Sequence, residues 1–353
     1  MPFLPSTLHT RYRDEIRLLD SGFTRFWCAV GIVSALILPW ILSNFWTGVA
    51  NQALIAIVGA LALNLLMGIT GQISLGHAGF LAAGAFISAA LVTHFDAPLG
   101  VSLLCSLVGG AVIGVLVGLP ALRLKGLYLA VSTLAAHFVI IVGLGQYQNA
   151  ASDGAGFTMP SPSFFGLQIV SERQWFYVLL PISLLALLVQ INWLRSAFGR
   201  AWMAIHHRDV SAEVLGVRVA RYKLLAFSAS TALTCFCGAL GAYHTGFVSV
   251  EAFDIHLLIQ YLAMVIIGGL GSVVGSVLGA VFVVAVPHVI TAATAAAPFL
   301  QGLGSKVFEI QIGVFGIVML LFLVLEPRGL AGVWARVRAY FELWPLKFRA
   351  WES

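Results

Sequence analysis

Ile69 to Phe86 reads ITGQISLGHAGFLAAGAF and lies inside a long run that contains no charged residue. Its start holds four polar side chains within eight positions, which are Thr70, Gln72, Ser74 and His77. Hydroxyl, amide and imidazole groups donate and accept hydrogen bonds. In an apolar setting they can satisfy backbone groups where a helix breaks, or line the path of a solute across a membrane.

Two interpretations of this stretch stay open from the residues alone. In the first it is a turn, in which Gly68 and Gly71 break a helix and nearby glycines let a neighbouring helix approach closely. In the second the broken helix lies at membrane depth, and a group of four residues lines a translocation path or its gate. That group is Gln72, Ser74, Gly76 and His77.

Other patterns that could indicate catalysis are missing from the sequence. Lys306 follows a glycine-rich Gly-Leu-Gly-Ser, but the G-x-x-x-x-G-K-[ST] phosphate-binding pattern does not occur. There is no H-E-x-x-H, and the adjacent His206 and His207 point different ways on a helix, so they share a metal poorly. We therefore expect no catalytic residues, no metal site and no cofactor in this chain.

The composition indicates which structural elements position the polar residues of the stretch 69–86. The chain has 353 residues, of which 60% are hydrophobic and 9% charged, whereas soluble domains carry about 25% charged residues. We expect an all-α, polytopic transmembrane bundle, since continuous apolar runs of about 20 residues predict helices that cross a bilayer. Ten spans are predicted, at 26–43, 48–67, 75–94, 99–121, 127–147, 175–193, 224–247, 257–275, 277–297 and 308–325.

The basic residues predict the orientation of the bundle, because segments on the cytoplasmic side are rich in Lys and Arg. With the N-terminus inside, ten spans place 17 of the 19 basic residues on the inner side and leave Arg173 and Lys306 outside. Both termini are then cytoplasmic. The net charge of +5 is explained by topology, so no nucleic-acid partner is expected. The predicted parts are an N-terminal arm (1–25), a permease domain (26–327) and a tail (328–353).

Two segments between spans are long. The outer loop, 148–174, is rich in Ser, Gly and Pro. The inner loop, 195–223, has apolar residues at helical spacing and predicts one or two short amphipathic helices that stop at Gly216. The inner loop is expected either to lie on the membrane surface or to dock a cytosolic partner.

Short segments over nearly the whole chain match the motifs of one permease family. Ser211–Gly216 is similar to the coupling loop of ATP-binding-cassette importers. The other matching segments, in chain order, are Asn64–Gly68, Thr70–Ala78, Leu124–Ala130, Phe198–Ala201, Leu215–Val217, Tyr222–Phe227, Gly268–Ser272 with Gly275, and Glu326–Leu330. With these segments the chain resembles the LivM family of permeases for branched-chain amino acids.

The resemblance implies an ABC importer permease fold in a bacterial inner membrane. It implies a LivH-like second permease, two LivG/LivF-like ATPases that hold ATP-Mg, and a periplasmic binding protein. Leucine, isoleucine and valine are the implied substrates, with urea, short amides or other amino acids as alternatives. The implied ATPase-coupling residues are Arg200, Ala204, Arg208, Ala212, Glu213 and Gly216. The implied helix-packing or turn glycines are Gly68, Gly71, Gly268, Gly269 and Gly271.

Two other classes of function were weighed against an ABC permease. A self-sufficient secondary carrier would transport without partners, and proton coupling would call for buried ionisable groups. Nine of the ten predicted spans contain no Asp, Glu, Lys or Arg, and the tenth contains only Glu309, next to its first residue. This disfavours proton coupling but leaves sodium coupling open. A membrane enzyme or scaffold would need a cluster of catalytic residues at one membrane face, and none is found.

Overall fold

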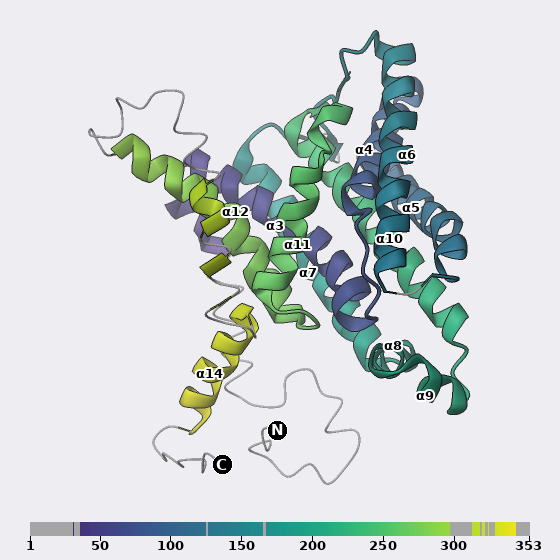
Figure 1. The fold of residues 1–353 in the computed structure, drawn as a ribbon. Coiled ribbons are helices and arrows are strands. Elements are labelled where there is room, and N and C mark those ends of the chain that lie inside the picture. Colours follow the sequence, from purple (N-terminus) through teal and green to yellow (C-terminus); the bar gives the residue numbers. More distant parts are fainter. Residues whose placement is uncertain are drawn as a thin grey trace.

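The structure, a computed structural model, describes residue 31 and residues 36–124, 126–164, 167–296, 313–317, 320–321, 324 and 329–343. This part of the chain is almost wholly helical, with four strands of two residues each (Figure 1). The predicted spans 26–43 and 308–325 lie largely outside the described residues, although residues 36–41 are helical. The predicted arm 1–25 lies entirely outside them.

Eight described helical segments are long and apolar enough to cross a membrane, and they correspond to the second to ninth predicted spans. The main helices are α3 (Asn44–Asn64), α4 (His77–Phe95), α5 (Leu99–Ala121), α6 (Leu127–Ser152), α7 (Glu172–Arg195), α10 (Val219–Thr245), α11 (Ile255–Gly268) and α12 (Val273–Ala296). A π-helical turn, η1 (Leu65–Ile69), extends α3, and a short 3-10 turn, η2 (Val250–Ala252), precedes α11.

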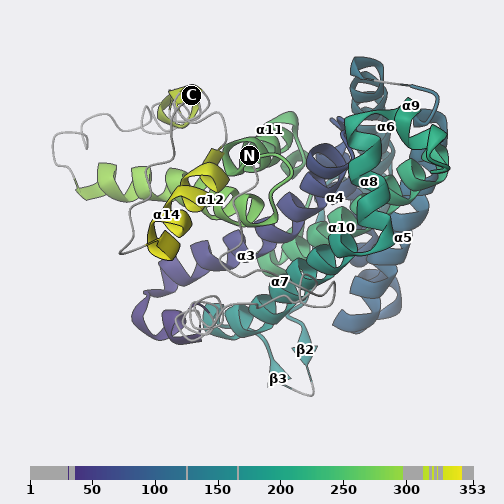
Figure 2. The ribbon, with the colours of Figure 1, turned by 90° about the horizontal axis from the view of Figure 1, so that it is seen from below.

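The shorter elements lie at the two ends of the bundle. The inner loop forms α8 (Ala197–His207) and α9 (Asp209–Val214), and α14 covers Gly329–Leu343. The strands are β1 (Phe157–Thr158), β2 (Ser163–Phe164), β3 (Leu167–Gln168) and β4 (Phe247–Val248). We call the end that carries α8 and α9 the inner end. Figure 2 looks onto this end, with α8 and α9 in front of α10.

Helix α10 is the centre of the fold and packs on α3, α4 and α5. Three glycines of α5, one helical turn apart, face it: Gly110, Gly114 and Gly118. Helix α4 approaches α10 in the same way: Gly238 packs against the Leu81 carbonyl group of α4, and Gly84 of α4 packs against the Cys235 carbonyl group. Small residues let membrane helices approach closely, which favours van der Waals packing where lipid offers no hydrophobic driving force.

The outer end is tied together by an antiparallel pair of short strands. Phe157 pairs with Val248, and Thr158 pairs with Phe247, so the loop after α6 is joined to the segment after α10. The helices also extend into the predicted loops. Helix α6 continues to Ser152 and α7 starts at Glu172, so the outer loop is shorter than 148–174.

The end of the predicted span 257–275 is wrong. Helix α11 stops at Gly268, and α12 begins at Val273 after a turn. Gly271 takes a φ of 80° in this turn, a conformation that glycine adopts at no steric cost. The side chain of Asn64 holds the turn, because its Oδ1 accepts from Gly271 N at 2.8 Å and its Nδ2 donates to Ser272 O at 3.2 Å. The break therefore depends on a contact with a distant helix.

Candidate functional site

The polar stretch forms an irregular segment between η1 and α4, which we call the inner segment (residues 70–76). The π-helical turn widens the end of α3, a feature often found at functional sites. Hydroxyl groups satisfy the freed backbone: Thr70 Oγ1 donates to Leu66 O at 2.6 Å, and Leu75 N donates to Thr133 Oγ1 at 2.9 Å. Part of this polarity thus serves the backbone, as the first interpretation expected.

The predicted gate residues are buried rather than exposed in a turn. Gln72, Ser74 and His77 retain 6%, 2% and 2% of their surface, and Gly76 is buried as well. Gly76 packs closely against α6: the Thr133 carbonyl oxygen lies 2.8 Å from the position that a Cβ atom on Gly76 would take. The polar side chains of the inner segment are therefore packed inside protein, although Gly71 and Ile73 are exposed. Burial in protein is the condition for irregular backbone at membrane depth.

His77 begins α4 and meets two other helices. Its ring lies 4.8 Å from the Tyr261 ring of α11, and its Nδ1 is 3.3 Å from Thr234 Oγ1 of α10. Its Nε2 is buried and has no hydrogen-bond partner among the described residues. A buried polar atom without a partner is costly, so this imidazole is a candidate group for interaction with a solute.

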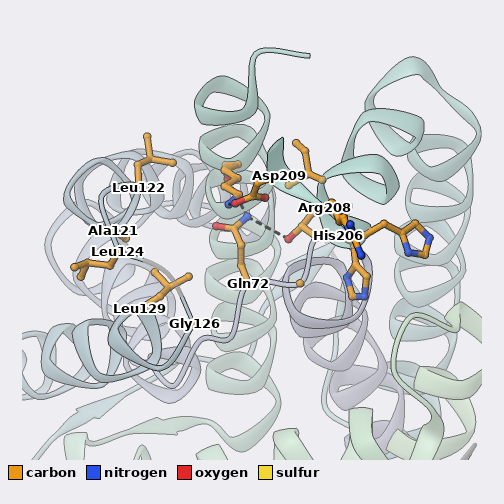
Figure 3. Close-up of a pocket in the computed structure, with 14 residues that line it drawn as sticks. Gln72, Ala121, Leu122, Leu124, Gly126, Leu129, His206, Arg208 and Asp209 are labelled. Carbon is orange, nitrogen blue, oxygen red and sulfur yellow. Dashed lines mark hydrogen bonds and ion pairs between the residues drawn. The ribbon is translucent and has the colours of Figure 1, made fainter. Parts of the chain in front are cut away.

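Gln72 faces the inner end. Its Nε2 donates to Thr70 Oγ1 at 3.1 Å and to the Lys223 carbonyl oxygen at 3.3 Å. It lines a cavity of about 220 Å³ between the inner segment, the inner ends of α5 and α6, and the inner loop. In Figure 3, Gln72 lies between Leu122, Leu124 and Leu129 on one side and His206 and Arg208 on the other.

Helix α8 packs directly against the end of α3. Trp202 is 3% exposed, clusters with Leu65 and Ile69 of η1, and donates from Nε1 to Tyr222 O at 2.9 Å. The ring of His206 lies against Gly71, and its Nδ1 is 3.0 Å from the position that a Cβ atom on Gly71 would take. The inner loop and the inner segment are thus in contact, although they are far apart in the sequence.

Helix α9 ends in a regular stop. Gly216 takes a φ of 84°, Gly216 N donates to Glu213 O at 2.9 Å, and Val217 N donates to Ala212 O at 3.0 Å. This pair of bonds is the Schellman motif. Lys223 Nζ binds Asp209 Oδ2 at 2.6 Å and so ties the start of α9 to α10. The two short helices and the stop at Gly216 were predicted from the pattern.

The large apolar side chains of α9 and of the residue after it face outwards, whereas two of those of α8 are buried. Val210, Val214 and Leu215 are 70%, 83% and 80% exposed, whereas Trp202 and Ile205 of α8 are each 3% exposed. The sequence pattern left open whether the inner loop forms one helix or two, and the structure has two, because Arg208 takes an extended conformation and separates α8 from α9. Exposed apolar groups of this kind mark surfaces that contact a partner or a membrane.

The other predicted inner-loop residues are spread over this surface. Arg200, Arg208 and Glu213 are exposed, Ala204 is half-buried and Ala212 is buried. Of the predicted glycines, Gly71 lies against His206, and the others are at the α11–α12 turn, where Gly68 lies against Gly271 and Gly268 lies against Gly275. Gly269 is the last residue before the turn and has a φ of 111°. Among the described residues, no three His, Cys, Asp or Glu side chains gather as metal ligands would.

Sequence reasoning missed Asn64, Thr133 and Tyr261, which hold the α11–α12 turn, the inner segment and the His77 ring. Asn64 opens one of the motifs quoted above, so an amide in an apolar helix was a usable signal. Thr133 and Tyr261 stand in ordinary helical sequence and gave no signal.

Comparison with known proteins agrees with this architecture. Residues 45–323 match the family described as "Branched-chain amino acid transport system / permease component". The high-affinity branched-chain amino acid transport system permease proteins LivM of Salmonella typhimurium and Escherichia coli are 30% and 29% identical to the chain. Each alignment covers 85% of this chain and 73% of the relative.

A probable branched-chain amino acid transport permease protein LivM of Methanocaldococcus jannaschii is 22% identical over 81% of this chain and 86% of its own length. No solved structure is significantly similar to the chain. The family match covers most of the chain and all eight apolar helices of the described bundle. This multi-pass membrane protein therefore belongs to the family of permease components of branched-chain amino acid transport systems.

Proposed function

We propose that this chain is one permease subunit of an ATP-driven importer for leucine, isoleucine and valine in a bacterial inner membrane. It acts with a LivH-like second permease, two LivG/LivF-like ATPases that bind ATP-Mg, and a periplasmic binding protein. Permeases of this family work with ATPases and binding proteins in general. The names of the relatives support the substrate, since the Salmonella and Escherichia proteins are named as branched-chain amino acid permeases.

The observation that carries the proposal is the contact between α8 and the end of α3. A partner that docks on the exposed apolar residues of α9 would push on a loop that already touches the inner segment through His206 on Gly71. The same loop clusters with η1 through Trp202. Movement of the inner loop would then displace Gln72 and the start of α4. This gives ATP hydrolysis outside the chain a mechanical route to the predicted gate.

The chemistry of the buried residues fits an energy source outside this chain. Among the described residues, every buried polar side chain is Ser, Thr, Asn, Gln or His, and none is Asp, Glu, Lys or Arg. Proton-driven carriers use chains of buried Asp, Glu or His as relays, and of these residue types the described part of the chain buries only His77 and His137. The same feature favours neutral substrates, because a charged side chain would lack a partner in the bundle.

The test is reconstitution of the chain with its four candidate partners in liposomes. We expect uptake of leucine, isoleucine and valine that needs the binding protein and ATP inside the liposomes. The panel includes urea, a short amide and other amino acids. ATPase subunits with an inactivated phosphate-binding loop are the control and should abolish uptake. Ion-driven uptake by this chain alone would instead show a secondary carrier and overturn the proposal.

A further inference from the structure

A second cavity, of about 350 Å³, lies between α10 and α11 on the side of Tyr261 away from the inner segment. One face of α10 lines it, with residues one helical turn apart: Cys237, Gly238, Gly241, Ala242 and Thr245. These positions extend over roughly 12 Å of helix. The cavity therefore reaches from the outer end of α10 to about the middle of the bundle.

The space exists because of small residues on α10. Beside Gly241, no described atom lies within 4 Å of the position that a Cβ atom would take. Gly241 is half-buried, and protein interiors are close-packed, so open space beside it is a specific feature of this face of α10. The volume falls in the range of small-molecule pockets, about 300–1,000 Å³.

The lining is suited to an aliphatic group. Ile55, Leu81 and Leu257 contribute alkyl side chains, and Phe253 contributes a ring. Thr245 Oγ1 already bonds to the Gly241 and Phe247 carbonyl oxygens, each at 2.9 Å. None of the described lining residues is Asp, Glu, Lys or Arg.

The two ends of the cavity differ in polarity. Its floor is Tyr261, whose hydroxyl lies 3.5 Å from Cys237 Sγ and whose ring packs on His77. Near its mouth, the exposed Glu251 and Asp254 line an adjoining cavity that shares Phe253 with this one. Negative charge at the mouth attracts an ammonium group, while the interior accepts an apolar side chain.

We propose that this cavity receives the branched aliphatic side chain of the transported amino acid, and that Tyr261 and His77 close its floor. The inference rests on the proposed function and adds the place where substrate size is read. On this view the predicted gate separates the outer apolar cavity from the inner cavity that Gln72 lines.

The test fills the cavity by replacing Gly241 in the reconstituted importer. With Gly241→Leu we expect leucine and isoleucine uptake, per assembled complex, to fall at least ten-fold, valine uptake to fall less and alanine uptake least. The change of one methylene in an apolar pocket alters selectivity by roughly ten-fold or more. Gly143→Leu is the matched control, because Gly143 is exposed on α6 and also has open space around it. It should keep uptake within two-fold of wild type.

Gly241→Ala covers the case in which the larger substitution prevents assembly. It should lower the ratio of leucine to alanine uptake in a complex assembled in normal amount. Wild-type leucine-to-alanine ratios in Gly241→Ala and in any assembled Gly241→Leu would overturn the inference. An equal fall in the uptake of all four amino acids would also overturn it. So would the finding that the Gly241 variants lose a bound phospholipid while their selectivity is unchanged, because the cavity would then be a lipid site. If the wild-type complex transports none of these amino acids, the proposed function itself fails, whatever Gly241 does.

Discussion

Gln72 and Lys223 are hydrogen-bonded although they are 151 positions apart, with Gln72 Nε2 donating to the Lys223 carbonyl oxygen at 3.3 Å. The ammonium group of the same lysine binds Asp209 at the start of α9. One residue of α10 thus joins the inner segment to the inner loop. This pair of contacts links the predicted gate to the predicted docking helix.

Replacing Gln72 by alanine should uncouple the importer. The lost hydrogen bond contributes about 1 kcal/mol, so we expect uptake to fall roughly five-fold while ATP hydrolysis by the assembled complex continues. Uptake and ATP hydrolysis are measured on the same liposomes. Gln146→Ala, at an exposed position of α6, should change neither. A parallel loss of both activities in Gln72→Ala would show that the residue supports assembly instead.

Gly216→Val should abolish uptake without removing the protein from the membrane. A left-handed residue other than glycine costs about 1–2 kcal/mol, and α9 has only six residues to keep its end in place. Glu213→Lys should have the same effect by reversing an exposed charge beside the stop. Gly100→Val, in open space on α5, is the control. Wild-type uptake by both inner-loop variants would contradict the coupling role.

Cysteines at positions 72, 74 and 77 should differ in their reactivity towards a charged thiol reagent. Gln72→Cys lines the inner cavity and should react from the cytoplasmic side, whereas Ser74→Cys and His77→Cys are buried and should be protected in the resting state. Labelling is measured in a background in which the native cysteines are replaced by alanine. If the inner segment is a gate, substrate with ATP should expose position 74 or 77. Unchanged protection at both positions during turnover would favour a static turn.

Asn64→Leu should destabilise the fold. The change removes both bonds to the α11–α12 turn and leaves Gly271 N without its partner, at a cost of about 2 kcal/mol or more. Thermal unfolding of the detergent-solubilised protein should show a lower midpoint than wild type. Asn192→Leu, at an exposed position of α7, should leave the midpoint unchanged. Equal midpoints for Asn64→Leu and wild type would show that the turn holds without the clamp.

The sequence by itself determined the class of the protein, the second to ninth spans, the helices of the inner loop and the stop at Gly216. These features depend on local quantities: the length of an apolar run sets a span, and a glycine after a short helix ends it. Each can be read within about 20 residues, without knowledge of which helices are neighbours.

Only the tertiary structure decided that Asn64 ends α11 early, that His77 packs on Tyr261 and that α9 turns its apolar residues outwards. It also decided that open space remains beside Gly241. The physical reason is that contacts between helices depend on how closely and at what angle their surfaces meet. In lipid this packing, rather than a hydrophobic driving force, determines which helices associate. The pattern of apolar residues along one helix does not predict it.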